Sequence, residues 1–180
     1  MIKVSSAYIS DTNISHMAPY LYFISFIDSR NNGYLYVGET CERFGALGRL
    51  ARHLSYENSQ NRNGATFLNN IQKYGCISSF SVVKDLSILA VDLREYGMFD
   101  GDANRIKRMG LEFLVRSEMQ AFSSDGAVVI PYEVISTAKK NKYSSKLEFE
   151  KIAKEIIKEI AEKIVFMTGN IKTSSEAAML

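Results

Sequence analysis

The sequence predicts an α+β fold, in which a small three-stranded sheet, antiparallel or mixed, is flanked by helices and followed by a long amphipathic helix. Three observations support this. Aromatic and β-branched residues fill 20–27 and 34–38, which favours strands. Apolar residues recur at helical spacing in several segments between 45 and 122. Residues 145–167 carry an apolar stripe among lysines and glutamates, which is typical of a helix packed on one face.

The first two strands are expected to pair as an antiparallel hairpin. The residues between them, Asp-Ser-Arg-Asn-Asn-Gly at 28–33, are turn formers. Asn32-Gly33 in particular tolerates the positive φ angles of tight turns. The loop 39–44 should then lead into a helix.

That helix is predicted over 45–54, where Leu47, Leu50 and Leu54 share one face. The later elements are expected from the same kinds of pattern, with Gly75 ending a helix and Pro131 interrupting a short strand. In order they are a loop (55–64), a helix (65–74), a strand (80–86, continued over 88–93), a loop (94–104), a helix (103–122), a short strand (128–134) and the helix 145–167.

The length of 180 residues suits about one domain. We expect an N-terminal arm over 1–18, a compact domain over 19–135 and a helical extension over 136–180. The apolar stripe of the last helix has two interpretations, because it could cover the sheet or form a homodimer.

Composition excludes several classes of protein. Cys41 and Cys76 lie far apart without the spacing of a zinc site, and two free thiols suit a reducing compartment. No apolar run approaches a membrane span, and the N-terminus lacks the apolar stretch of a signal peptide. A soluble cytoplasmic protein without a membrane partner is expected. The net charge of +2 neither requires nor excludes nucleic acid.

An ordered set of residues resembles the GIY-YIG nucleases. Tyr20-Leu21-Tyr22 stands at the first triplet, and Tyr36-Val37-Gly38 stands at the second. Arg49 and His53 then supply an Arg-x-x-x-His spacing on the next helix, and the likeness continues to about residue 122. The resemblance implies a compact phage, homing or restriction-like DNA endonuclease that uses Mg²⁺ or Mn²⁺ and leaves 5′-phosphate and 3′-hydroxyl ends.

These residue types suit phosphodiester hydrolysis. Arg49 and His53 are four residues apart, so they share a helix face and can converge on one phosphate. Tyr22 and Tyr36 could position or deprotonate water. Each residue alone has an ordinary alternative, since tyrosines favour strands and arginines favour solvent. The substrate-binding candidates are Gly38, Arg43, Arg52 and Lys73, with Gly38 giving room for substrate or the next loop.

The metal-binding carboxylate has two candidates on one predicted helix. Glu118 falls within the apolar stripe, where an isolated charge is costly unless it binds a cation. Glu112 has Arg108 and Arg116 at four-residue spacing, as a solvated, ion-paired glutamate would. Glu118 is therefore the favoured metal ligand and Glu112 the alternative.

The sequence departs from the family pattern in three places. Tyr20 replaces a glycine, and the gap from Gly38 to Arg49 is a little long, which implies an enlarged loop. The segment around Pro131 also lacks an expected asparagine, which a residue such as Asn69 or Asn70 would have to replace. Two other functions therefore stay open. One is a catalytically silent nucleic-acid-binding module on the same fold. The other is a protein-interaction module acting through the C-terminal helix.

Overall fold

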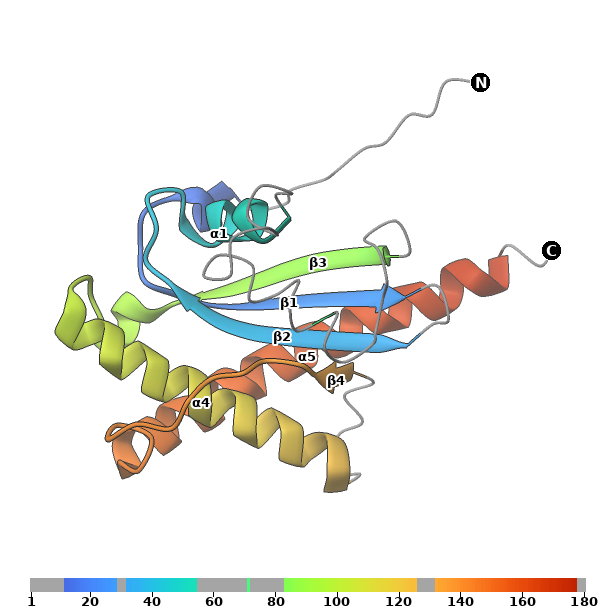
Figure 1. The fold of residues 1–180 in the computed structure, drawn as a ribbon. Coiled ribbons are helices and arrows are strands. Elements are labelled where there is room, and N and C mark those ends of the chain that lie inside the picture. Colours follow the sequence, from blue (N-terminus) through green and yellow to red (C-terminus); the bar gives the residue numbers. More distant parts are fainter. Residues whose placement is uncertain (1–11, 29–31, 55–70, 72–82, 126–131, 178–180) are drawn as a thin grey trace.

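The computed structural model describes residues 12–28, 32–54, 71, 83–125 and 132–177. They form an α+β fold around a mixed four-stranded sheet with the strand order β3-β1-β2-β4 (Figure 1). A short 3₁₀ helix, η1 (Thr12–Ser15), precedes the sheet. The predicted fold class is confirmed in outline, whereas the predicted number of three strands was too low.

The expected hairpin is confirmed. β1 (Tyr20–Asp28) pairs antiparallel with β2 (Gly33–Thr40), so that Tyr22 lies opposite Gly38. Asp28 closes the turn, because its carboxylate accepts hydrogen bonds from the backbone and side-chain nitrogens of Asn32. β2 extends two residues into the predicted loop, which places Glu39 in the sheet.

Two further strands flank the hairpin. β3 (Val83–Asp92) pairs antiparallel with β1, and β4 (Tyr132–Val134) pairs parallel with β2 over Gly33–Leu35. β4 is the strand that makes the sheet mixed. Three residues carry little periodic signal, so its place beside β2 depends on contacts with residues nearly 100 positions earlier.

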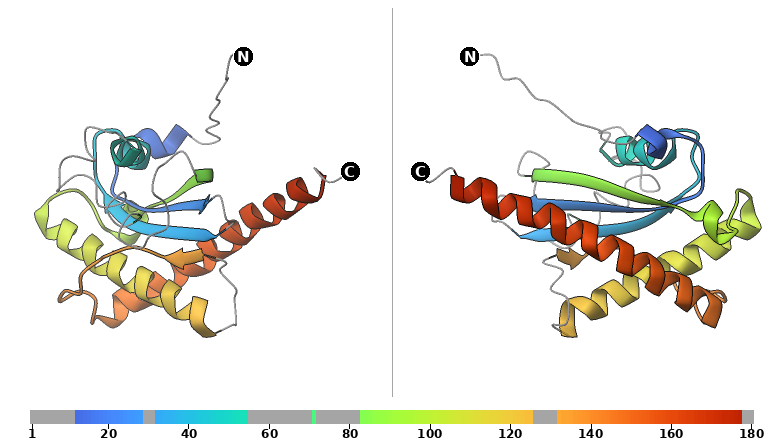
Figure 2. Two further views of the ribbon diagram at one scale, coloured as in Figure 1. Left: turned by 45° about the vertical axis from the view of Figure 1, so that its right-hand side comes forward. Right: turned by 180° about the vertical axis from the view of Figure 1, so that it is seen from behind.

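Helices cover both faces of the sheet (Figures 1 and 2). α1 (Gly45–Leu54) lies over one face, and α4 (Asp102–Asp125) with α5 (Leu147–Ala177) covers the other. The alternation of strand side chains divides the interior into two cores. The core under α1 includes Tyr20, Tyr22, Ile24, Tyr34, Tyr36 and Leu50; the core under α4 and α5 includes Leu21, Phe23, Leu35, Val37, Leu111 and Val115.

The C-terminal helix packs against the sheet along its first half. Phe149, Ala153, Ile156, Ile157 and Ile160 are buried in the same core as strand residues of β1 and β2. Of the two interpretations of its apolar stripe, coverage of the sheet holds for these residues. No helix in the described ranges is long and apolar enough to cross a membrane.

Other predicted elements agree in position or lie outside the described residues. α1 has the predicted bounds, and α4 extends beyond its predicted bounds at both ends. α5 begins at Leu147 instead of residue 145 and extends past the predicted end at residue 167 to Ala177. A 3₁₀ helix, η3 (Leu93–Tyr96), occupies the start of the predicted loop before α4. The predicted loop 55–64, nearly all of the helix 65–74 and the beginnings of the strands at 80 and 128 fall outside the described residues.

Candidate functional site

Two tyrosines and a glycine meet on the face of the sheet under α1. Tyr22 on β1 and Tyr36 on β2 point to this face, and their ring centroids lie 6.2 Å apart. Gly38 lies directly opposite Tyr22 in the β1–β2 ladder. Strand pairing therefore brings together residues of both sequence triplets.

Gly38 makes room for the Tyr22 phenol. A Cβ atom at position 38 would lie 2.3 Å from the hydroxyl oxygen of Tyr22 and 2.4 Å from its Cζ, far inside van der Waals contact. The sequence suggested that this glycine admits substrate or the next loop. In the structure the space is instead filled by Tyr22, so Gly38 fixes where that hydroxyl lies.

His53 contacts Tyr22 from α1. Its Nε2 and the Tyr22 hydroxyl oxygen share a hydrogen bond of 2.9 Å, and its ring also packs against that of Tyr36. His53 is fully buried. Burial, followed by the charges of Arg49 and Arg52, lowers the pKa of His53 to about 3. The imidazole is therefore neutral near pH 7, and it would accept a proton readily only where a change in its surroundings raised this pKa.

Arg49 lies one turn earlier on the same helix face. Its Nε donates to the Tyr22 hydroxyl oxygen at 3.5 Å, a long contact, and its Nη1 lies 3.2 Å from Oε1 of Glu42. Arg52 also contacts that oxygen of Glu42, at 3.0 Å. A single carboxylate thus bridges two guanidinium groups beside the tyrosines. Sequence reasoning missed Glu42; its position, seven residues before Arg49 in the loop that leads into α1, was the available signal.

Both tyrosines are neutral in this arrangement. Burial raises the pKa of Tyr22 well above its ordinary value, and Arg49 opposes that rise. Burial also raises the pKa of Tyr36, with smaller contributions from Tyr22 and Glu112. A cation brought near the phenols would favour their ionised forms.

Glu112 on α4 is the carboxylate whose charge acts on both tyrosines. Burial and then the charge of Glu39 raise the pKa of Glu112 to about 8, against the opposing effect of Arg49 and Arg116. Part of its side chain reaches the surface, so solvent moderates this effect. The sequence-based interpretation of Glu112 as a solvated glutamate paired with Arg108 and Arg116 was wrong in its pairing, because neither arginine forms an ion pair with it among the described residues and Arg116 acts only through its charge.

Arg108 has other partners. This buried guanidinium donates from Nε to Glu39 at 2.8 Å and from Nη1 to the carbonyl of Phe99 at 2.6 Å. The pairing joins the start of α4 to the end of β2. Because Arg108 pairs with Glu39, it does not pair with Glu112, and the negative charge of Glu112 is opposed only by the more distant charges of Arg49 and Arg116.

Glu118, the favoured metal ligand from sequence, lies elsewhere on α4. It is six residues beyond Glu112, which places it about 240° further around the helix axis. It is partly exposed. Glu112, by contrast, is brought into the electrostatic environment of Tyr22, Tyr36 and Arg49.

Two of the remaining candidates, Arg43 and Arg52, are exposed at the surface near Glu42 and Phe44. Arg43 is exposed, with its guanidinium 5.6 Å from the ring centroid of Phe44. Arg52 has half of its side chain exposed. Lys73, Asn69, Asn70 and Pro131 lie outside the described residues.

Among the described carboxylates, Glu112 is the one that could contribute a ligand to a hard divalent cation near the tyrosines. The described ranges contain no cluster of three or more histidine, cysteine, aspartate or glutamate side chains that could enclose a metal. Mg²⁺ commonly uses one or two carboxylates and keeps several water ligands. Glu112 could supply one such carboxylate, and a bound cation would favour its ionised form.

We found no family model, curated protein or solved structure that matches this chain. What the site does is therefore inferred from its own geometry.

Proposed function

We propose that this protein is a metal-dependent DNA endonuclease of the GIY-YIG type. The observation that supports this most directly is the pair of contacts that the Tyr22 hydroxyl makes with Arg49 and His53. Gly38 leaves the space that the Tyr22 ring occupies. A phenol held between a guanidinium and a neutral imidazole is suited to moving a proton beside a phosphate. A buried tyrosine needs one hydrogen-bond partner for its hydroxyl, and His53 already supplies it, so the additional guanidinium of Arg49 is the feature that favours this proposal.

The proposed proton path runs through Tyr22. His53 is neutral, so its Nε2 can accept the phenolic proton while the Tyr22 oxygen takes a proton from an attacking water. Burial is the main cause of the low pKa of His53, and a phosphate bound at Arg49 and Arg52 would offset the smaller contribution of their two positive charges. Substrate binding would thus make His53 a better proton acceptor. Tyr36 packs against both rings and helps to orient them.

Arg49 and Arg52 form the proposed phosphate clamp. Both guanidinium groups already converge on one carboxylate oxygen of Glu42. Carboxylates and phosphates present similar acceptor oxygens to guanidinium groups. We infer that a phosphate takes the place of Glu42 when substrate binds, and that Arg43 adds charge at the edge of the site.

Glu112 would hold the divalent ion, Mg²⁺ or Mn²⁺. When bound, such an ion supplies Lewis acidity toward the phosphate and neutralises charge on the leaving oxygen. Glu112 replaces Glu118 as the preferred ligand in this proposal, since only Glu112 is tied to Tyr22 and Tyr36 through its charge. The products would carry 5′-phosphate and 3′-hydroxyl ends, and the protein would act in the cytoplasm.

A plasmid-nicking assay with Mg²⁺ tests the proposal. We expect Arg49→Ala and Glu112→Gln to lose at least about a hundredfold in rate, the usual scale for removing a catalytic group. Glu118→Gln is the matched control on the same helix and should retain activity. Nicking that depends on Glu118 instead of Glu112 would overturn the assignment of the carboxylate.

Binding measurements separate the alternative functions. DNA binding at low salt without nicking by the wild-type protein would indicate a silent nucleic-acid-binding module. The absence of both would refute the two nucleic-acid proposals. Concentration-dependent association without DNA affinity would then favour an interaction module or a homodimer formed through α5.

A further inference from the structure

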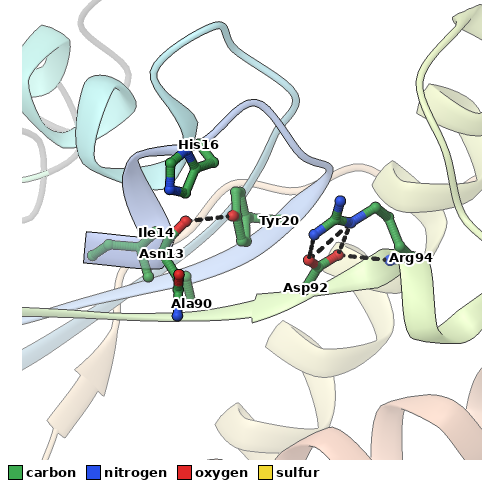
Figure 3. Close-up of a pocket in the computed structure, with 7 residues that line it drawn as sticks. All are labelled: Asn13, Ile14, His16, Tyr20, Ala90, Asp92 and Arg94. Carbon is green, nitrogen blue, oxygen red and sulfur yellow. Dashed lines mark hydrogen bonds and ion pairs between the residues drawn. The ribbon is translucent and has the colours of Figure 1, made fainter. Parts of the chain in front are cut away.

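Figure 3 shows a pocket of about 330 Å³. It lies on the same face of the sheet as the candidate site, because Tyr20, which lines it, belongs to the core that contains Tyr22 and Tyr36. It lies between the N-terminal residues around η1 and the last residues of β3. The residues that line it are Asn13, Ile14, His16, Tyr20, Ala90, Asp92 and Arg94. The proposed hydrolysis uses none of them.

Two groups of contacts shape the walls. The Tyr20 hydroxyl donates to the backbone carbonyl of Asn13 at 2.8 Å, which ties the N-terminal segment to the sheet. Arg94 donates from Nε to both carboxylate oxygens of Asp92, at 3.0 and 2.9 Å. Asp92 thereby fixes the plane of an exposed guanidinium. His16 and Arg94 lie on either side of Tyr20 in Figure 3.

The pocket suits a flat, uncharged heterocycle better than an anion. Asp92 offsets the charge of Arg94, so little net positive charge faces the opening. A guanidinium plane and an imidazole offer stacking surfaces, and Ile14 and Ala90 add apolar contact. Nucleobases stack on arginine and aromatic planes in single-stranded nucleic-acid sites.

The distance to the proposed catalytic tyrosine is short. Ala90 is the β3 partner of Tyr22, and Tyr20 is two residues from Tyr22 on the same face. Two residues along a strand span about 7 Å. Stacked nucleotides advance about 3.4 Å each. A strand with its phosphate at Arg49 would therefore bring a base one or two nucleotides away to the pocket.

We propose that this pocket binds the base of a nucleotide that flanks the cleaved phosphate, an inference that rests on the proposed nuclease function. Arg94 would supply the stacking plane, and Asp92 would orient it. The pocket would thus select substrates in which such a base can leave the helical stack.

Uncharged nucleosides test the pocket separately from catalysis. Adenosine, guanosine, cytidine and thymidine would be titrated into ¹⁵N-labelled full-length protein, with ribose 5-phosphate as the phosphate-bearing control. We expect saturable shifts at the amides of Ile14, His16, Ala90 and Arg94 with at least one nucleoside, and none there with ribose 5-phosphate. Arg94→Lys keeps the charge and removes the plane, and it should weaken nucleoside binding about fivefold or more.

The matched control is Arg105→Lys. Arg105 is also exposed, but it contacts Glu39 on β2 and does not line the pocket. It should bind nucleosides as the wild type does. No saturable shift at the pocket amides, or equal binding by Arg94→Lys, would overturn the proposal. Nucleoside binding by a protein that never nicks DNA would refute the nuclease function and retain the nucleobase pocket. Nicking without nucleoside binding would refute the pocket alone.

Discussion

Removal of the Glu42 carboxylate should strengthen DNA binding. In the structure, one oxygen of Glu42 contacts both Arg49 and Arg52, at 3.2 and 3.0 Å. Under the proposed function these arginines hold a phosphate, so Glu42 competes with substrate for them. Glu42→Gln keeps the size of the side chain while removing its charge.

The magnitude follows from how exposed each pair is. Ion pairs at protein surfaces contribute about 0.2–1 kcal/mol each. The side chains of Glu42 and Arg49 are 21% and 19% exposed, which places their pair toward the upper end, whereas Arg52 at 50% exposure belongs toward the lower end. Together they amount to about 1 kcal/mol, which corresponds to about a fivefold lower Kd.

The assay is fluorescence anisotropy of a labelled duplex, in EDTA to prevent cleavage and at low salt. Glu148→Gln is the matched control, because it makes the same change in net charge at a glutamate on α5 that is 66% exposed. Tighter binding by Glu42→Gln than by Glu148→Gln is expected. Equal binding, or weaker binding by Glu42→Gln, would refute the competition and indicate that Glu42 supports Arg49.

Three further predictions concern the frame of the site. Gly38→Ala should displace the Tyr22 phenol, costing about 1–3 kcal/mol in urea unfolding and most of the proposed nicking activity. Unchanged values would show that Tyr22 can move aside for a Cβ atom at position 38. With an ordinary pKa of 4.5 when unfolded and about 8 when folded, Glu112 should make wild-type stability fall as pH rises from about 4.5 to about 8. Glu112→Gln should remove that pH dependence of stability and also the stabilisation by Mg²⁺ near pH 8. Thermal melts of Glu112→Gln that match those of the wild type would contradict the proposed role of Glu112. Arg108→Ala should lower the free energy of unfolding by about 3–5 kcal/mol, because Glu39 loses its buried partner. A decrease below about 1 kcal/mol in chemical denaturation would show that solvent replaces Arg108.

Local patterns were sufficient for the hairpin and for one side of the site. The turn residues at Asn32-Gly33 and the aromatic runs beside them act over a few positions, so the pairing of Tyr22 with the second triplet could be anticipated. The four-residue spacing of Arg49 and His53 fixes them on one face of α1 wherever that helix packs. Tertiary structure added that this face lies against Tyr22.

The surroundings of Glu112 could not be predicted from local patterns, because they depend on contacts between segments far apart in the sequence. Helical spacing alone paired Glu112 with Arg108, but Arg108 instead meets Glu39 at the end of β2. The pKa of Glu112 depends on burial and on charges from β2 and α1, which no single helix encodes. In the same way, the space beside Gly38 is filled by a tyrosine sixteen residues earlier in the chain. The sequence alone determined the local elements and the residues that each one presents. Only the tertiary structure decided which carboxylate acts on both tyrosines through its charge, because desolvation and charge pairing are properties of neighbours in space.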